Sequence, residues 1–336
     1  MRIGRTLFVF LSALSVTAFG LGILGCGESD TSSGDASGGM QRYKLVSGGQ
    51  TGVYYPTAMA ISRLLKNVDA NLELTVQTSG GSVANARMLA REDAEFAILQ
   101  NDIAAYARQG KLMFDGSPMP QIVGVAALYP EHIQIVAMAK AGIQRVTDLK
   151  GKRVAIGAIG SGTEANAMQI LDAYGVKEAD LSRIERLKAS ESRDYLQDKR
   201  VDAAFFTFGV GTAAIQELAL RHEIVFVPVD GTARNKLMAE LPFYREAAIP
   251  TGAYRKAAAG KAAVPPTDVP TVTVMATLAA RQGVPDDVVE KVLRGVFENL
   301  DEFRKTHSRL ADVNKQDSLS NLTLPVHPGA KAFYEQ

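Results

Sequence analysis

The sequence predicts an α/β protein with two lobes, each a mixed, mostly parallel sheet flanked by helices. Short apolar strands alternate with helices, and Gly/Ser-rich turns follow the carboxyl ends of the strands, as in parallel α/β sheets. The chain has 336 residues and 46% hydrophobic content, enough to bury a large core and to divide into lobes. The stretches ARMLAREDAEFAIL and RDYLQDKRVDAAFF share a helix, an Asp-Ala pair and a strand, a weak echo that favours two similar lobes.

The clearest strand-turn-helix unit is RVAIGAIGSGTEANAMQILDAYG at residues 153–175. Residues 154–156 read as a buried strand, and apolar residues recur at helical spacing from residue 164. Between them, Gly160-Ser161-Gly162-Thr163 lets backbone approach a ligand and directs the free N–H groups of the first helical turn outward. Such a helix end is a seat for an anion, although an ordinary capped turn would have the same residues.

Similar turns recur along the chain. A strand at 43–46 runs through the turn at 48–52 to a helix at 58–65, and the strand LELTVQT runs through residues 79–82 to the helix VANARMLARED. The strand EFAILQND ends at Gln100 before a helix at 102–108. Residues 208–212 join the strand AAFFTFG to a helix at 212–221. Ligands of open α/β sheets bind beyond the carboxyl ends of strands, so these turns predict one site.

The first 26 residues predict export. Arg2 and Arg5 precede an apolar run from residue 7 to residue 24, and Ile23-Leu24-Gly25-Cys26 is similar to a bacterial lipobox. Residues 1–26 are therefore predicted to be a lipoprotein signal peptide with lipidation at Cys26; an uncleaved membrane anchor is the alternative. Residues 27–42 are polar and Gly/Ser-rich, which predicts a tether with a reach of ~20–25 Å. The folded part is thus expected to be periplasmic or at the cell surface.

Composition excludes several partners. The formal net charge of +1 gives no support for nucleic acid. Cys26 is the only cysteine, so disulfides and thiolate metal sites are not expected once it is lipidated. The four histidines lack ligand spacing, which predicts no metal. No cofactor is expected, and the protein is expected to be a monomer.

The lobes are predicted from where the chain crosses between them. Residues near 129–132, between the strands IVGVAAL and IQIVAMA, form the first crossing, and the strand at 224–231 forms the return. Lobe 1 then comprises residues 43–129 and 230–336, and lobe 2 comprises residues 130–229. An amphipathic helix is predicted to begin at Pro285-Asp286, with a core-facing apolar stripe that extends to Phe303.

Three enzyme hypotheses lack residues that they require. The run GSGTEA matches a dinucleotide fingerprint, but Arg186 and Lys188 occupy the next strand where an acidic residue is expected. A P-loop would need a Lys after the last glycine. Ser161 and Ser82 lack the nucleophile elbow, and His327 is the nearest candidate base without a suitable context. We therefore expect binding without turnover.

The predicted ligand is a small carboxylate. Four helix amino ends converging on a cleft contribute typically ~0.3–1 kcal/mol each. Oriented hydrogen bonds from Tyr54 or Tyr55, Ser82, Asn85 and Gln100 would add to them, although the tyrosines could simply pack. Asp102 either meets a ligand ammonium or only caps its helix.

Several motifs together resemble a known family. GGQTGVYYP, QTSGGSVANARML, FAILQND, DLKGKRVAIGAIGSGTEANA, VDAAFFTFG, PFYREAAIPTGAY and LPVHPGA, in this order, are similar to TAXI-type solute receptors of tripartite ATP-independent periplasmic (TRAP) transporters. The resemblance covers about residues 43–334. It implies a two-lobed, type II-like periplasmic binding fold that closes on glutamate or a related C5 dicarboxylate and delivers it to a TRAP permease.

The same resemblance implies the ligand loops. The predicted ligand-binding residues are Gly52, Tyr54, Tyr55, Ser79, Gly80, Gly81, Ser82, Asn85, Gln100, Asp102, Gly160, Ser161, Gly162, Thr163, Phe208 and Gly209. Two departures affect these loops: Val53 replaces a usual Thr, and Gly211-Thr212 replaces a Leu-Pro-type step. A membrane-tethered sensor that uses the same cleft is the alternative function, favoured if a histidine-kinase gene rather than a permease gene lies beside this one.

Overall fold

The computed structural model describes residues 39–255 and 262–336. The predicted signal peptide, Cys26 and residues 27–38 of the tether lie outside the described residues. The described part belongs to one compact unit that starts at Gly39. None of its helices combines the length and the apolar character that crossing a membrane requires.

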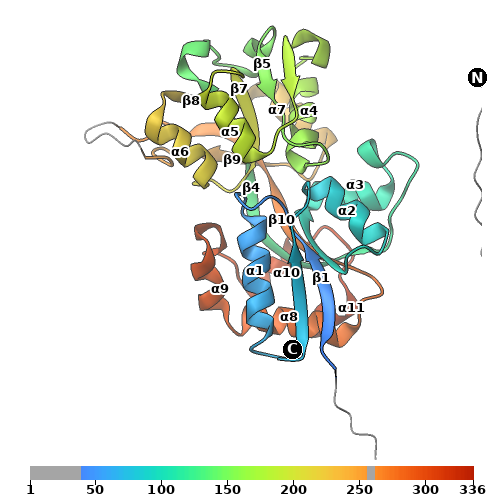
Figure 1. The fold of residues 1–336 in the computed structure, drawn as a ribbon. Helices are drawn as coiled ribbons and strands as arrows, with labels where there is room; N and C mark the ends of the chain where they lie inside the picture. Colours follow the sequence, from blue (N-terminus) through green and yellow to red (C-terminus); the bar gives the residue numbers. More distant parts are fainter. Residues whose placement is uncertain (1–38, 256–261) are drawn as a thin grey trace, which may run out of the picture. The chain divides into compact units, whose positions relative to one another are not determined.

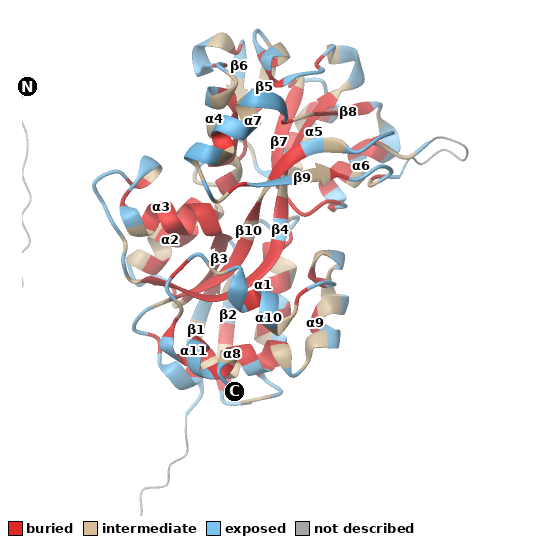
Figure 2. Cartoon of the chain, turned by 180° about the vertical axis from the view of Figure 1, so that it is seen from behind, coloured by how far each residue is buried: buried red, intermediate tan, exposed pale blue. Residues whose placement is uncertain are grey.

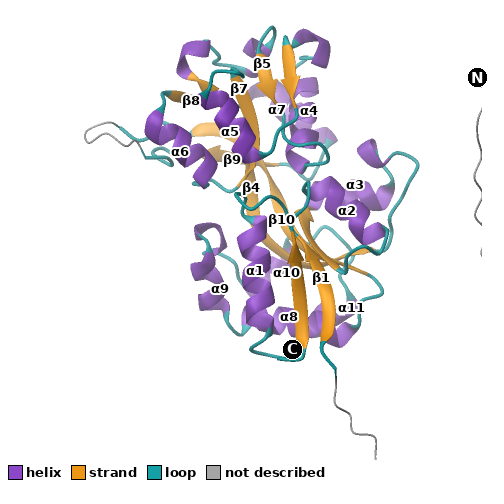
Figure 3. Ribbon diagram, in the orientation of Figure 1, coloured by secondary structure: helices purple, strands orange, loops and turns teal. Residues whose placement is uncertain are grey.

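The first part of the chain alternates strands and helices as predicted (Figure 3). It consists of β1 (Gln41–Val46), α1 (Tyr54–Leu65), β2 (Leu72–Gln77), α2 (Ser82–Ala90), β3 (Phe96–Gln100), α3 (Asn101–Gln109) and β4 (Ile122–Met138). β1 pairs in parallel with both β2 and β3. The turns after these three strands therefore lie at one edge of the sheet.

The second part repeats the alternation. It consists of β5 (Arg153–Ala155), α4 (Gly162–Ala173), β6 (Arg183–Glu185), α5 (Ala189–Gln197), β7 (Ala203–Phe208), α6 (Ala213–Arg221), β8 (Ile224–Val227), α7 (Gly231–Glu240) and β9 (Arg245–Ile249). β5 pairs in parallel with both β6 and β7. The chain then continues through β10 (Val269–Arg281), α8 (Asp286–Phe297), α9 (Leu300–Thr306), α10 (Lys315–Ser320) and α11 (Pro328–Tyr334).

The strand order shows two similar lobes. The sheet runs β2-β1-β3-β10-β4-β7-β5-β6, and both β10–β3 and β4–β7 are antiparallel. Each lobe thus has three parallel strands with the first in the middle, followed by one antiparallel crossing strand. This arrangement confirms the predicted α/β fold class with helices flanking mostly parallel strands, but the sheet expected in each lobe is one part of a single continuous ten-stranded sheet. β4 and β10 pair with each other and run between the two groups of elements (Figure 1).

The first crossing is a single long strand. The predicted strands on either side of residues 129–132 are one continuous element, β4, whose residues are nearly all buried (Figure 2). The second crossing differs from the expected one at 224–231. Leu237, Tyr244 and Val272, which follow the predicted boundary at residue 230, pack in the core of β5, β7 and α4. The packing changes lobe within β10, a strand that the sequence analysis left unassigned.

The C-terminal helices complete the first lobe. The stripe of α8, including Val288, Val292 and Val296, is buried against Leu64 and Leu65 of α1, as predicted. The predicted helix does not continue unbroken to Phe303. It ends at Phe297 and α9 begins at Leu300, and the Asn299 side chain between them donates to the carbonyl of Gly295.

Candidate functional site

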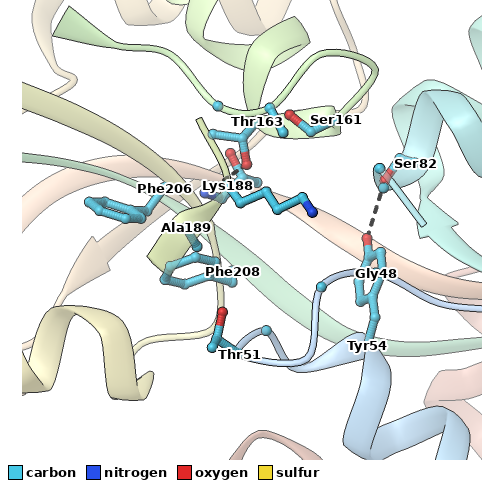
Figure 4. Close-up of a pocket in the computed structure, with 18 of the residues that line it drawn as sticks. Gly48, Thr51, Tyr54, Ser82, Ser161, Thr163, Lys188, Ala189, Phe206 and Phe208 are labelled. Atoms are coloured by element: carbon cyan, nitrogen blue, oxygen red, sulfur yellow. Dashed lines mark hydrogen bonds between the residues drawn. The ribbon is translucent and has the colours of Figure 1, made fainter. Parts of the chain in front are cut away.

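A cavity of about 570 Å³ lies where the turns of both lobes meet. The first lobe contributes the turns after β1 and β2 and the end of β3, and the second contributes the turn after β5, the start of α5 and the end of β7. Glu131 of the crossing strand β4 also lines it. The volume falls within the range of small-molecule sites. Figure 4 shows side chains from both lobes around this space.

Most of the predicted ligand-binding residues line the cavity. They are Gly52, Tyr54, Ser79, Gly80, Gly81, Ser82, Gln100, Ser161, Gly162, Thr163 and Phe208. The parallel pairing of β1 with β2 and β3, and of β5 with β6 and β7, brings their turns to one edge in each lobe.

Five predicted residues do not line the cavity, and four of them have structural contacts instead. Asn85 is fully buried and donates from Nδ2 to the carbonyls of Ser47 and Ile98, at 2.5 and 2.7 Å. It therefore fixes α2 to its sheet. Gly209 packs closely against Arg309. A Cβ at this position would lie only 2.1 Å from Arg309 Cδ, so the contact requires glycine.

Two further predicted residues, Tyr55 and Gly160, also lie outside the cavity lining. Tyr55 lies half-buried in the first turn of α1 and is not among the cavity residues. The carbonyl of Gly160 accepts the N–H groups of Val83 and Ala84, each at 3.1 Å. This contact occupies two donors of the amino end of α2, which the sequence analysis assigned to a ligand. Gly162 allows close contact between the lobes, since a Cβ at this position would lie 1.8 Å from Gln100 Oε1.

Asp102, the fifth, forms part of a buried connection between the lobes. Asn166 of α4 donates from Nδ2 to Asp102 Oδ2 at 2.9 Å and to the hydroxyl of Tyr244 at 2.8 Å. Gln100 Nε2 donates to Asn166 Oδ1 at 3.1 Å. Burial raises the pKa of Asp102 to about 6, although the N–H of Ile103 and the amide of Asn166 oppose this shift by binding the carboxylate. Asp102 thus bonds to the opposite lobe.

The helix ends at the cavity differ from the predicted set. The turn before α6 is directed elsewhere, because the N–H of Gly211 donates to the hydroxyl of Tyr254 at 3.0 Å. α5 takes its place, since Lys188, Ala189 and Ser190 line the cavity. In the described part of the chain, no acceptor receives the backbone N–H groups of Ala189 and Ser190. They remain available to a ligand.

The amino end of α4 behaves as the sequence predicts. Ser161 caps it by accepting the N–H of Glu164 at Oγ, at 3.0 Å. Among the described residues, the N–H groups of Gly162 and Thr163 have no acceptor. Two adjacent helix ends in the second lobe, α4 and α5, therefore offer donors and the positive ends of their dipoles to the cavity.

Lys188 is a site residue that sequence reasoning missed. It was noted only as a residue that breaks the dinucleotide fingerprint. Its backbone N–H donates to Glu191 at 2.9 Å, which places it at the start of α5. The side chain is exposed and extends across the cavity toward Tyr54 and Ser82 (Figure 4). Its position immediately before a helix, in the turn that follows β6, was the available signal.

Glu131 was also missed, because it lies inside a strand rather than in a turn. It is 2% exposed, and its Oε2 accepts a hydrogen bond from the hydroxyl of Tyr54 at 2.7 Å. Burial raises the pKa of Glu131 to about 8; the hydrogen bond from Tyr54 opposes this rise and the charge of Asp102 adds to it. Glu131 is therefore mostly protonated at neutral pH in the ligand-free cleft.

A short hydrogen-bonded chain orients the first-lobe side of the cavity. The hydroxyls of Tyr54 and Ser82 lie 3.4 Å apart, and Ser82 Oγ accepts the N–H of Gln100 at 3.1 Å. The opposite wall is aromatic. The rings of Phe206 and Phe208 lie 5.4 Å apart between centroids, and both residues line the cavity. No group of three or more potential metal ligands occurs within residues 39–255 and 262–336.

Comparisons with known proteins agree on the fold. The model of the NMT1-like family matches residues 45–336. MatC from Rhodopseudomonas palustris, solved with bound malate, is 15% identical with a TM-score of 0.54, and the match covers 88% of this chain and 96% of that one. The periplasmic binding protein BugD is 14% identical, with a TM-score of 0.54 and coverage of 88% and 93%.

An ancestral arginine-binding protein, solved with arginine, is 13% identical with a TM-score of 0.51, and the match covers 81% of this chain and 99% of that one. At these identities the likenesses show the fold alone. It is the fold of two-lobed periplasmic binding proteins, as the sequence predicts. The TAXI-type subgroup stays a prediction, because the family match is to the NMT1-like family as a whole.

Proposed function

We propose that this chain, which belongs to the NMT1-like family, is an exported solute receptor that captures a small carboxylate between its lobes and delivers it to a membrane permease. The observation that carries the proposal is the shared cavity of about 570 Å³, into which two free helix ends and one lysine are directed. Among the described residues that line the cavity, no nucleophile is paired with a base. Such a lining suits a protein that captures and releases its ligand unchanged.

The second-lobe wall supplies the affinity for an anion. The amino ends of α4 and α5 contribute up to ~2 kcal/mol each in a partly buried site. Lys188 adds a positive charge and hydrogen-bond donors. Micromolar binding requires about −8 kcal/mol, so these groups and the oriented first-lobe hydroxyls of Tyr54 and Ser82 are of the right order.

The finer identity rests on the sequence motifs. Their resemblance to TAXI-type receptors supports a TRAP permease as the partner and glutamate or a related C5 dicarboxylate as the first ligands to test. The lipobox supports anchoring at a membrane surface through Cys26.

The test is calorimetry with a panel of small carboxylates on wild type, Lys188→Met and Lys140→Met. Lys140 is an exposed lysine of the same lobe that does not line the cavity, which makes it the matched control. We expect at least tenfold weaker binding for Lys188→Met and unchanged binding for Lys140→Met. Equal affinities of Lys188→Met and wild type for the bound carboxylate would contradict the proposed site.

A further inference from the structure

Glu131 presents an unpartnered oxygen to the cavity. Its Oε2 is held by the Tyr54 hydroxyl, whereas no described residue donates a hydrogen bond to Oε1. The residue is 2% exposed, so bulk water does not solvate this oxygen freely. An accessible oxygen that no protein group pairs, at the wall of a cavity, is a position for a ligand donor.

The two acid–base side chains of the cavity, other than tyrosine, lie at separate positions. Among the described residues that line it, Lys188 is the only cation and Glu131 the only acid. Lys188 stands at the amino end of α5 in the second lobe and Glu131 lies in the crossing strand β4, and no ion pair joins them among the described residues. The space between them is therefore open to a molecule that carries both an anionic group and a donor.

Part of the cavity wall is apolar, and it is supplied by Val53, Leu187, Phe205, Phe206 and Phe208. Phe206 and Phe208 lie on the side of Lys188 from which its amine points away, toward Tyr54 and Ser82 (Figure 4). A second carboxylate on the ligand would meet no second cation among the described residues that line the cavity, only backbone donors and hydroxyls, so its desolvation would be offset less than that of the first. An uncharged body would instead gain from contact with the aromatic side chains.

From this arrangement we propose that Glu131 is a specificity-determining residue, which binds the amine of a small amphoteric ligand while Lys188 and the amino ends of α4 and α5 bind its single carboxylate. The ligand class is then amino acids with an uncharged side chain. The inference rests on the proposed function and narrows its ligand class from small carboxylates to amino acids with an uncharged side chain. This class differs from the dicarboxylates that the sequence motifs favour.

Binding of such a ligand releases a proton. Burial raises the pKa of Glu131 to about 8, so the carboxyl is mostly neutral in the empty cleft at pH 7. A ligand ammonium favours the carboxylate form, and the proton leaves Glu131 for the buffer. The titratable groups around Glu131 are Tyr54, Tyr129 and Asp102. Burial raises the pKa values of both tyrosines well above the ordinary value, so they stay neutral.

The experiment measures thermal stabilisation by matched pairs of acids. The pairs are leucine with 4-methylpentanoate, phenylalanine with 3-phenylpropanoate, and glutamate with glutarate. The same carbon skeleton is compared with and without its amine. We expect an uncharged amino acid to raise Tm, its deaminated partner to raise it far less, and glutamate to raise it less than the uncharged amino acids. Equal shifts within each pair, a larger shift with glutamate, or no shift with any amino acid would overturn the inference.

Variants assign the effect to Glu131. Glu131→Gln keeps an oxygen that accepts from Tyr54 but cannot become anionic, so the amino acid should bind at least tenfold more weakly and its deaminated partner about equally. Asp102→Asn is the matched control, a buried acid outside the cavity, and should preserve the preference for the amine. Preserved preference in Glu131→Gln would contradict the assigned role.

The number of protons released on binding separates the two possible roles of Glu131. A purely structural role would leave this number unchanged. Calorimetry of the amino acid at pH 7, in buffers of different ionisation enthalpy, should show release approaching one proton in wild type and none in Glu131→Gln. The two proposals fail separately. A deaminated acid that binds through Lys188 as well as its amino acid would leave the carboxylate receptor standing and remove the role of Glu131.

Discussion

Asn166 of the second lobe donates a hydrogen bond to Asp102 of the first over 2.9 Å, and both side chains are fully buried. Gln100 Nε2 bonds to the same asparagine, and Tyr106 of α3 meets Phe243 edge-on at 5.6 Å between ring centroids. One side of the cleft is thus closed by contacts between lobes, which identifies the described conformation as one in which the lobes touch beside the cavity.

The first prediction concerns stability and pH. The pKa of Asp102 is about 6 in the folded protein, above its ordinary 3.8, so the folded state binds more protons than the unfolded state between these values. The contribution of Asp102 to the free energy of unfolding therefore falls as pH rises from about 4 to 6, by ~3 kcal/mol in total. The free energy of unfolding of Asp102→Asn minus that of wild type should rise by about this amount across the same window.

Denaturant titrations at several pH values measure this difference. Other titrating groups, including His132, whose pKa burial and Arg309 lower to about 4, are shared by both proteins and cancel. The exposed Asp115→Asn serves as control and should give a curve parallel to that of wild type. A parallel curve for Asp102→Asn would show that this carboxyl is not perturbed.

The second prediction tests the contact between lobes. A methyl group at Gly162 would lie 1.8 Å from Gln100 Oε1, so Gly162→Ala should hold the lobes apart on this side and weaken ligand binding at least tenfold. Gln100→Ala removes the side chain that obstructs the methyl group. In that background, Gly162→Ala should therefore reduce ligand affinity only slightly. An equal loss of affinity in both backgrounds would place the effect of Gly162 elsewhere.

The third prediction separates binding from stability in α2. Ser82 lines the cavity and its Oγ accepts the buried N–H of Gln100, so Ser82→Ala should weaken ligand binding and also lower the free energy of unfolding by ~1 kcal/mol. Asn85 bonds to two buried carbonyls instead, so Asn85→Ala should lower the free energy of unfolding by ~1–3 kcal/mol through unpaired polar groups. Calorimetry of ligand binding, together with chemical denaturation of the ligand-free variants, distinguishes them. Loss of stability in Ser82→Ala alone would reverse the two assignments.

The fourth prediction concerns the anchor, which rests on the sequence alone. If Cys26 carries lipid, Cys26→Ala should move the protein from the membrane fraction to the soluble exported fraction. Cell fractionation with immunodetection measures it. Membrane retention of the variant with its leader removed would refute lipidation at this residue.

Much of the fold could be predicted, because its signals are local. Strand-turn-helix units around residues 79–82 and 160–163 show hydrophobic periodicity and small turn residues, and both turns line the cavity. The boundary at residue 230 could not be predicted, because the lobe to which α7 belongs is decided by contacts of Leu237 and Tyr244 with distant strands.

The cavity itself was only partly predictable. Lys188 and Glu131 are its only basic and acidic side chains among the described residues, yet neither lies in a glycine-rich turn, and only tertiary pairing brings them to the same space. Asn85 and Asp102 follow turns that line the cavity, but their side chains point into the protein, a direction that sequence spacing does not define.

The central claim, capture of a small carboxylate between the lobes, is tested most directly by native mass spectrometry of protein purified without refolding. The account predicts a bound small acid that is displaced on denaturation, retained by Lys140→Met and lost from Lys188→Met. A bound molecule that lacks a carboxylate, or one that Lys188→Met retains as fully as wild type, would contradict it.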